Sequence, residues 1–283
     1  SRTGRDGPSS FSAAGSPRLP CGAEGGVYSP RFLEATDALY DIHMGVENMA
    51  PLLYTLVRFL KPRRCLEVGA GYTTPFLLQA LHDNFCEMRN YRRLDSVGGC
   101  HVNGTPWCVP NALEASQAGE LPVLDCLDNM AHEHTTAHRV LEAAESLGTS
   151  SHLKLHVLDA FSFANLTEQE RVDILGARPP LCWDLIWVDL GAGPRIENFI
   201  RQLWGQVNPH GGMVLLHSSL TNTVSRDFVE KMRTRARAVE PDPDFGSFAE
   251  LSLLEPHKLF QNSVSCFQRR GEAYTEPTYT RYG

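Results

Sequence analysis

The sequence predicts an α/β fold, in which a doubly wound, mostly parallel sheet of seven strands carries helices on both faces. Three observations predict it. Short apolar runs typical of buried strands alternate with helical segments from residue 64 onwards. Two glycines, Gly69 and Gly71, follow the first of these strands and precede a helix. Near the C-terminus two strand-like segments follow one another, which indicates an antiparallel hairpin.

Composition limits the function classes. The chain has 283 residues, and its 42% hydrophobic content is enough for a substantial core. Lys and Arg total 26 against 33 Asp and Glu, which gives a net charge of −7. Such a chain repels a duplex phosphate backbone on average, so we expect no nucleic acid as the main partner. No run approaches the roughly 20 apolar residues that span a bilayer, so we expect a soluble protein without a membrane span.

Three regions are expected along the chain. Residues 1–28 are rich in Ser, Gly, Pro and Arg, which predicts a flexible leader, because this composition buries too little apolar surface to fold. The leader could be a transit-peptide remnant or a linker, so we expect the protein in the cytoplasm or in an organelle lumen such as the plastid stroma. Residues 29–270 should form one domain, followed by a tail over 271–283.

The domain should begin with a helical cover over residues 29–61, where apolar side chains recur every three to four positions. Pro51 is expected to divide this cover into two helices. Residues 64–69 predict a short buried strand that stops at glycine. Residues 73–81 then predict a helix capped by threonine.

The alternation continues downstream and predicts a parallel sheet with crossover helices. The predicted strands are residues 121–127, 153–158, 183–188 and 212–217, and the predicted helices are 132–147, 166–175, 196–207 and 224–238. The final strands, 248–254 and 263–268, should form the antiparallel hairpin at the sheet edge. Residues 83–120 have little periodicity and many turn formers, so they predict an inserted flap, either bordering the site or a mobile surface excursion.

The most informative motif is Glu67-Val-Gly-Ala-Gly71-Tyr-Thr-Thr74. Glycines at this point let the backbone turn sharply after a strand and approach a ligand, and the following helix presents free N–H groups. A dinucleotide-binding turn begins in the same way. However, position 74 is Thr where the dinucleotide fingerprint has its third glycine, and Glu67 stands two residues before the first glycine.

These residues resemble the first motif of the class I S-adenosylmethionine (SAM) dependent methyltransferases, which have a Rossmann-like fold. The resemblance covers roughly Leu52 to Gln268. It is strongest in CLEVGAGYTT, VLDCLDN, VLDAF and WDLIWVDLGAGPRIENFIRQLWGQVNPHGGMVLLHSS, four motifs in the order in which the family has them. It implies a cofactor site made of Glu67, Gly69, Ala70, Gly71, Tyr72, Thr73, Thr74, Asp128, Asn129, Asp159, Ala160, Phe161 and Asp189.

Roles follow from the same resemblance. The glycine turn with Glu67 would line the methionine end of SAM. Asp128 would accept hydrogen bonds from both ribose hydroxyls, a natural pairing of a carboxylate with a diol. Asp159 would accept from the adenine amino group, beside Ala160 and Phe161. Each Asp alone could instead cap a helix or lie in a solvated loop, but ligands in such sheets bind at the carboxyl ends of strands, where both are expected.

Asp189 and the pair His217-Ser218 resemble the fourth and fifth strand ends of catechol-type O-methyltransferases. Those enzymes place an Asp and an Asp-Asn pair there to hold a divalent cation. Replacing a carboxylate by an imidazole disfavours a hard Mg²⁺ ion, so we expect no obligatory metal, while a softer ion on Asp189 and His217 stays open. The segment His132–His138 lacks the HExxH spacing of a zinc helix, so His134 and His138 are expected on an exposed helix face.

Without a metal, His217 is the predicted general base and Asp189 orients it, although a strand-end His can also serve structure alone. His43 and Glu47, four residues apart on one helix face, could cover the acceptor pocket, or form a solvated pair. His43 completes the predicted catalytic set.

We therefore expect SAM-dependent methylation of a hydroxyl, amine or thiol of a small molecule, with S-adenosylhomocysteine (SAH) as product. One alternative is a methyltransferase-like subunit that has lost catalysis and serves in binding or assembly; a weaker one is a nicotinamide-dependent oxidoreductase. A homodimer or association with a larger complex is compatible with the sequence.

Overall fold

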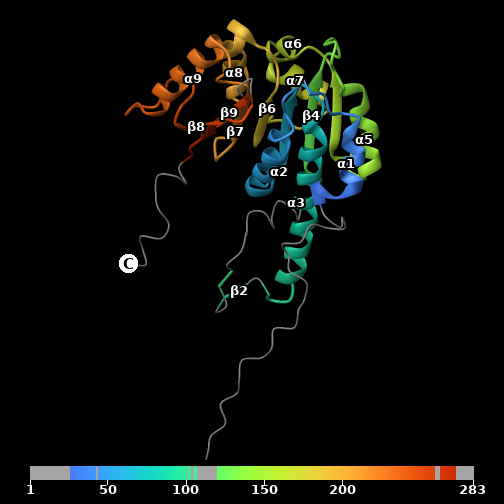
Figure 1. Ribbon diagram of the computed structural model, residues 1–283. Coiled ribbons are helices and arrows are strands. Elements are labelled where there is room, and N and C mark those ends of the chain that lie inside the picture. Colours follow the sequence, from blue (N-terminus) through green and yellow to red (C-terminus); the bar gives the residue numbers. More distant parts are fainter. Residues whose placement is uncertain are drawn as a thin grey trace, which may run out of the picture.

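A computed structural model describes residues 26–42, 44–99, 101–102, 105–106, 120–258 and 262–271. Their central feature is a seven-stranded sheet with helices packed on both of its faces (Figure 1). Its strands, in spatial order, are β5 (Leu153–Val157), β4 (Val123–Asp128), β1 (Arg64–Val68), β6 (Leu185–Val188), β7 (Met213–His217), β9 (Asn262–Arg269) and β8 (Phe248–Glu255). The first five run parallel, and β9 pairs antiparallel with β7 and β8. The predicted fold class and hairpin are confirmed.

The strand alternation builds two cores, one on each face of the sheet. Leu66 and Val68 of β1 point to the core shared with α6 (Ala160–Ala164), α7 (Glu168–Leu175), α8 (Ile196–Trp204) and α9 (Thr223–Ala236). Cys65 points to the opposite core, shared with α2 (Met49–Leu60), α3 (Thr73–Asp95) and α5 (Val140–Leu147). Because the period of a strand is two, Glu67 belongs to this second face.

The cover differs from the prediction in where it breaks. Helix α1 (Pro30–Asp37) and helix α2 are separated by residues 38–48, so Pro51 does not divide them. Pro51 is instead the third residue of α2, within the first turn, where the missing N–H costs no helical hydrogen bond. Of the predicted leader, Gly26–Tyr28 form a 3-10 turn (η1) in which Val27 is buried. The rest of the leader lies outside the described residues.

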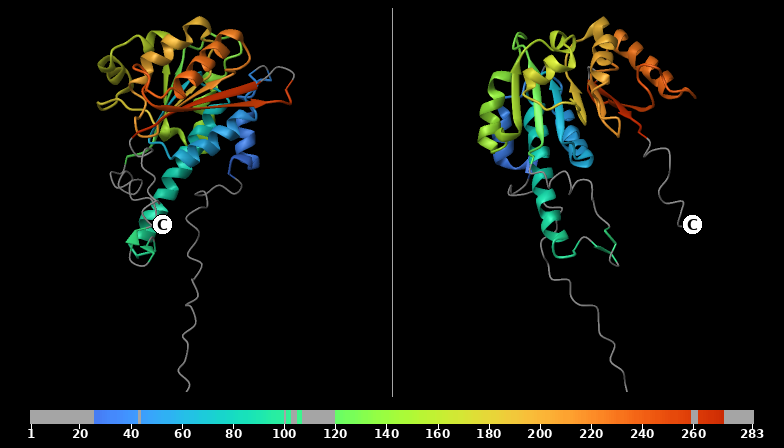
Figure 2. Two further views of the ribbon diagram at one scale, coloured as in Figure 1. Left: turned by 90° about the vertical axis from the view of Figure 1, so that its left-hand side faces the viewer. Right: turned by 180° about the vertical axis from the view of Figure 1, so that it is seen from behind.

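The predicted flap is wrong over its first third, because α3 continues to Asp95. Polar residues there suggested a loop, but they pair with α2. Tyr54 donates to Asp83 at 2.7 Å, and Arg58 donates to Asn84 at 2.6 Å and forms an ion pair with Glu87 at 2.7 Å. The end of α3 extends away from the sheet (Figure 2). Beyond it lie the short strands β2 (His101–Val102) and β3 (Thr105–Pro106); residues 107–119 are outside the described part.

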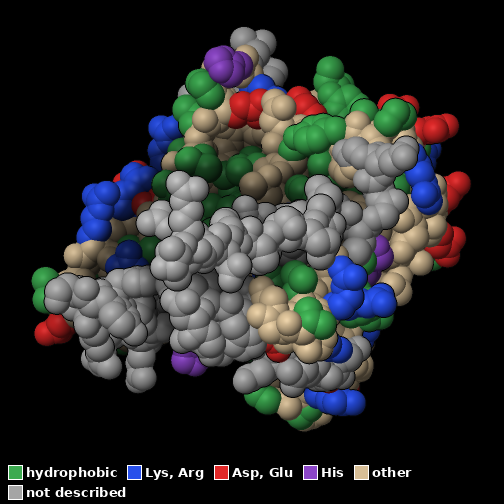
Figure 3. Space-filling view, turned by 90° about the horizontal axis from the view of Figure 1, so that it is seen from below, with side chains coloured by type: hydrophobic (Ala, Val, Ile, Leu, Met, Phe, Trp, Pro, Cys, Tyr) green, Lys and Arg blue, Asp and Glu red, His purple; other side chains and the backbone are tan. Residues whose placement is uncertain are grey.

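Two helix boundaries also differ. The helix predicted from residue 132 begins only at Val140, after a loop and the 3-10 turn η2 (Ala137–Arg139), and α6 was not predicted. Two further 3-10 turns, η3 (Ser150–His152) and η4 (Gly193–Arg195), precede β5 and α8. Within the described segments, no helix is both long and apolar enough to cross a membrane. On the face drawn in Figure 3, the Lys and Arg side chains of the described residues form separate groups and not one continuous stripe.

Candidate active site

A cavity of about 490 Å³ lies at the carboxyl ends of the parallel strands. This volume falls in the range of about 300–1,000 Å³ that is typical of small-molecule sites. The order of strands reverses between β1 and β6, and a crevice of this kind is where doubly wound sheets bind ligands. The lining comes from the ends of β1, β4, β5, β6 and β7, and from the loop between α1 and α2.

The glycine turn after β1 is fixed by close backbone contact with the end of β6. Gly69 has φ +93°, a conformation that side-chain-bearing residues rarely adopt. A Cβ at this position would lie 2.4 Å from the Asp189 carbonyl oxygen. The Asp189 N–H in turn donates to the Val68 carbonyl at 2.8 Å. Gly69 is therefore required for the turn and Asp189 to meet at the cavity.

Asp128, at the end of β4, lines the cavity and is half-buried. Its Oδ2 accepts from the Ala70 N–H at 3.0 Å, and its Oδ1 accepts from the Met130 N–H at 2.6 Å. These bonds tie the glycine turn to β4 and hold the carboxylate in one orientation. Each carboxylate oxygen retains a second lone pair for a ligand.

Asp159, after β5, lines the same cavity and also caps α6. Its Oδ1 accepts from the Ser162 N–H at 2.8 Å and from the Ser162 hydroxyl at 2.9 Å. Phe161 forms the adjoining wall, and the Arg195 guanidinium lies 3.5 Å from its ring centroid. The capping role and the place at the cavity therefore coexist.

Glu67 does not line the cavity. Its carboxyl is fully buried beneath the turn, where it accepts from the Thr73 hydroxyl at 2.6 Å and from the Cys126 thiol at 3.1 Å. Burial outweighs these hydrogen bonds and raises the pKa of Glu67 to about 7. Thr74 is buried too, and its Oγ1 accepts from the Gly71 N–H at 3.0 Å, so the predicted threonine cap on α3 does not form. Both residues support the turn from below.

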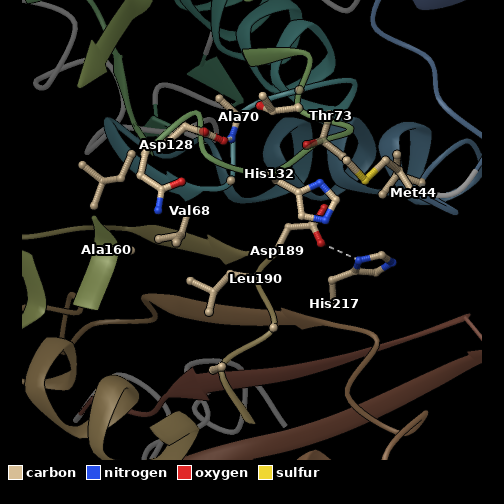
Figure 4. Close-up of a pocket in the computed structure, with 18 of the residues that line it drawn as sticks. Met44, Val68, Ala70, Thr73, Asp128, His132, Ala160, Asp189, Leu190 and His217 are labelled. Carbon is tan, nitrogen blue, oxygen red and sulfur yellow. Dashed lines mark hydrogen bonds and ion pairs between the residues drawn. The ribbon is translucent and has the colours of Figure 1, made fainter. Parts of the chain in front are cut away.

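Asp189 and His217 meet at the other end of the cavity, as the dashed line in Figure 4 shows. His217 Nδ1 lies 2.6 Å from Asp189 Oδ1, and His217 Nε2 lies 2.7 Å from Asn262 Oδ1. The His217 side chain is only 8% exposed, whereas that of Asp189 is 29% exposed. Asn262 was not predicted, because it is the first residue of the inner strand of the hairpin and carries no motif.

Comparison with known proteins identifies the fold of the chain through solved structures. No protein-family profile and no curated protein matches the chain. Among solved structures, the O-methyltransferase TomG from Streptomyces achromogenes, involved in tomaymycin synthesis and in complex with SAM, has a TM-score of 0.51 at 14% identity and covers 86% of this chain and 91% of its own. A putative O-methyltransferase from Klebsiella pneumoniae has a TM-score of 0.50 at 16% identity, covering 86% and 91%. The O-methyltransferase from Bacillus cereus in complex with SAH has a TM-score of 0.50 at 11% identity, covering 85% and 89%.

This chain has the fold of the class I SAM-dependent methyltransferases. In that fold the predicted cofactor residues fall into two groups here. Those that line the cavity are Gly69, Ala70, Gly71, Tyr72, Thr73, Asp128, Asn129, Asp159, Ala160, Phe161 and Asp189. Glu67 and Thr74 lie beneath it. Among the predicted catalytic residues, Asp189 and His217 line the cavity and His43 is outside the described residues.

The residues present do not fit a divalent cation of the catechol type. A metal would need a lone pair of His217, but both ring nitrogens lie at hydrogen-bond distance from oxygens of Asp189 and Asn262. The described residues contain no cluster of three or more His, Cys, Asp or Glu arranged to hold an ion. The predicted role of His217 as a general base would use one of the same two nitrogens, since that role needs a nitrogen lone pair.

Several lining residues stand in no sequence motif and were not predicted. Leu39, Met44 and Val46 come from the loop between α1 and α2 and give the cavity an apolar wall. His132, which begins the segment that lacks the spacing of a zinc helix, projects into the cavity from the loop after β4 (Figure 4). Glu47 does not line the cavity, and its carboxylate pairs with Lys258 at 2.8 Å. These residues lie in irregular backbone, where periodicity carries no signal.

Proposed function

We propose that this protein transfers the methyl group of SAM to a hydroxyl, amine or thiol of a small molecule, without a metal ion. One observation carries the proposal: a single cavity, at the strand ends where this fold binds ligands, joins the glycine turn to Asp128, Asp159 and Asp189. The structural neighbours TomG and the Bacillus cereus enzyme, solved with SAM and with SAH, support the choice of ligand.

The proposed cofactor contacts use groups that the fold already orients. Asp128 would accept from the ribose hydroxyls, and Asp159, with its free Oδ2, from the adenine amino group, while Phe161 covers the adenine face. The backbone of residues 69–71 would approach the methionine end. When bound, SAM supplies a methyl group that its sulfonium already makes electrophilic, so the protein mainly aligns the reactants and excludes water.

The acceptor would enter beside Asp189, under the apolar wall of Leu39, Met44 and Val46. Such a wall suits a molecule with an apolar body, whereas Asp189 suits a polar atom that carries hydrogen. A small organic acceptor is therefore the substrate class that the cavity favours.

Calorimetric titration with SAM tests the proposal. We expect the folded protein to bind SAM, and Asp128→Ala to weaken binding about 100-fold or more, because two charge-assisted hydrogen bonds are lost. Asp173→Ala is the matched control: its carboxylate lies on the exposed face of α7 and bonds Gln169, so SAM affinity should not change. A well-folded protein that binds no SAM would instead support a binding or assembly subunit.

A further inference from the structure

The polar residues beside Asp189 form a connected group whose role the proposed function leaves open. It joins four parts of the chain: the loop before α2, the end of β6, the end of β7 and the β8–β9 hairpin. We call it the Asn262 network. It consists of Gly45, Asp189, His217, Glu255, Lys258 and Asn262.

The orientation of the Asn262 amide is fixed by its surroundings. Its Nδ2 donates to the Gly45 carbonyl at 2.5 Å and to Glu255 Oε2 at 3.0 Å. Both partners only accept, so a flipped amide would bring its oxygen against two other oxygens. Asn262 is 4% exposed, and water cannot relieve such a clash. Its Oδ1 must therefore face His217.

The amide orientation decides the protons of His217. Asn262 Oδ1 is an acceptor, so His217 Nε2 must carry a hydrogen to bond it at 2.7 Å. The Asp189 carboxylate is also an acceptor, so Nδ1 must carry a hydrogen to bond it at 2.6 Å. A ring with hydrogens on both nitrogens is the imidazolium cation. In a neutral ring, one of the two contacts would set a lone pair against an oxygen.

The charges around the ring agree with a cation. Burial disfavours the charged form, but the charge and hydrogen bond of Asp189, with the bond to Asn262, outweigh it and raise the pKa of His217. Lys258, in the hairpin turn, acts in the opposite direction. Lys258 is itself neutralised by Glu47 at 2.8 Å and by Glu255 at 3.6 Å. Among the described residues, the uncharged Trp187 ring on β6 also lies near His217, 5.6 Å away between ring centroids.

We propose that Asn262 is a positioning residue: it locks His217 as an imidazolium, which fixes Asp189 as the group that accepts a hydrogen bond from the methyl acceptor. The inference rests on the proposed function only in its last clause. Asp189 Oδ1 is held by His217, and no described residue bonds Oδ2 at the cavity. Asp189 thus replaces His217 as the residue that receives the acceptor.

The same amide links this arrangement to the apolar wall. Gly45 stands between Met44 and Val46, and its carbonyl accepts from both Asn262 and Lys258, the latter at 2.9 Å. Displacing this loop would remove one of the two acceptors of Asn262 Nδ2 and leave only Glu255 Oε2 to fix the orientation of the amide. The loop that covers the acceptor therefore also stabilises the charge beside it.

Nuclear magnetic resonance of the full chain labelled with ¹⁵N-histidine tests the proposal directly. His217 is identified among the 11 histidines by the signal lost in His217→Gln. We expect both ring nitrogens of His217 to be protonated at pH 7.5, where a histidine with an ordinary pKa near 6.5 is mostly neutral. A neutral ring, protonated on one nitrogen only, would overturn the proposal. The protonation state itself is recorded on the unaltered chain, and the variant serves only to assign the signal.

A pair of variants tests the part played by Asn262. Asn262→Leu removes the acceptor for Nε2, so the protonation constant of His217 should fall about tenfold or more. Lys258→Gln is the matched control, because it removes another member of the network whose charge opposes the imidazolium. In Lys258→Gln the protonation constant of His217 should stay equal to that of the wild type or rise. Equal falls in both variants would show general loosening and would overturn the role of Asn262.

These spectra are recorded without SAM, so they are independent of cofactor binding. A protein with doubly protonated His217 that fails to bind SAM would contradict the proposed function and leave the locked cation standing. A protein that binds SAM with a neutral His217 would contradict the locked cation and leave the proposed function standing. The two failures are therefore distinguishable.

Discussion

The two halves of the cavity are held by different kinds of contact. In the glycine-turn half, formed by the ends of β1, β4 and β5, the partners are mostly backbone groups: Asp128 bonds two N–H groups, and Gly69 packs against a carbonyl. In the His217 half, formed by the ends of β6 and β7 and supported by β9 from behind the lining, side chains bond side chains. Backbone contacts tolerate little change, whereas side-chain networks can be altered one charge at a time.

The largest effect is expected where the glycine-turn half allows no side chain at all. Gly69→Ala would place a methyl group 2.4 Å from the Asp189 carbonyl oxygen, at a φ of +93°. We expect a loss of about 3 kcal/mol or more in the free energy of unfolding, because strain and a backbone clash add. Chemical denaturation measures it. Gly205→Ala, with nothing within 4 Å of the added Cβ, is the control and should cost far less. Equal losses of stability in the two variants would show that the backbone contact at Gly69 is not what makes the glycine-turn half intolerant of change.

The next effect concerns the buried carboxyl beneath the turn. In the unfolded chain Glu67 has an ordinary pKa, whereas in the fold its pKa is about 7. The folded state therefore holds one proton more between about pH 4.5 and 7, so this group lowers the free energy of unfolding as pH rises through that window. The total loss is roughly 3 kcal/mol by pH 8, at 1.36 kcal/mol for each pH unit of difference.

Glu67→Gln should remove that slope. Unfolding curves for wild type and variant, recorded from pH 5 to pH 8, should diverge, with the variant gaining relative stability at high pH. His217, whose pKa is raised, adds a slope of the same sign above its unfolded pKa, and that slope should persist in the variant. Parallel curves would mean that Glu67 is ionised throughout and that the glycine-turn half does not depend on a buried neutral acid.

A smaller effect tests the wall of the glycine-turn half. The Arg195 guanidinium lies 3.5 Å from the Phe161 ring centroid and holds the ring that we propose covers adenine. Arg195→Ala should weaken SAM binding about two- to fivefold, in line with roughly 0.5–1 kcal/mol for an exposed cation–π contact. Arg195→Lys, which keeps the charge but loses the flat stack, should fall between. Calorimetry measures the affinity. An unchanged affinity for SAM in both variants would show that the contact between Arg195 and Phe161 does not contribute to cofactor binding.

The same difference explains what the sequence could and could not predict. The strands follow from local patterns, since each is a short apolar run. The carboxylates Asp128 and Asp159 follow in the same way, because each lies where such a run stops. The sheet and the hairpin were predicted in this way and are confirmed. By contrast, α3 was cut short at residue 81, because the partners that bury Asp83 and Asn84 lie on α2, nearly thirty residues earlier.

The Asn262 network lies beyond local pattern altogether. Asn262 and Gly45 are 217 residues apart, and neither stands in a motif. His217 was predicted as a base because a strand-end imidazole beside an Asp suits that role. Its second partner, which occupies the remaining nitrogen, becomes visible only when β9 is placed next to β7. The place of His217 beside Asp189 was thus predictable from the sequence. Its hydrogen-bond partners and protonation depend on long-range contacts and were not.

The smallest effect on SAM binding is expected at the rim of the His217 half. Asn48 donates to Glu255 Oε1 at 2.5 Å in an exposed position and touches neither His217 nor the cavity. Asn48→Ala should cost about 0.5–1.5 kcal/mol of stability, the usual range for one hydrogen bond, and leave SAM affinity unchanged. Thermal unfolding and calorimetry together measure both. If SAM affinity fell severalfold, the two halves would be coupled through the hairpin and could not be treated as separate. An unchanged affinity would instead confine the role of the hairpin to the acceptor side of the cavity.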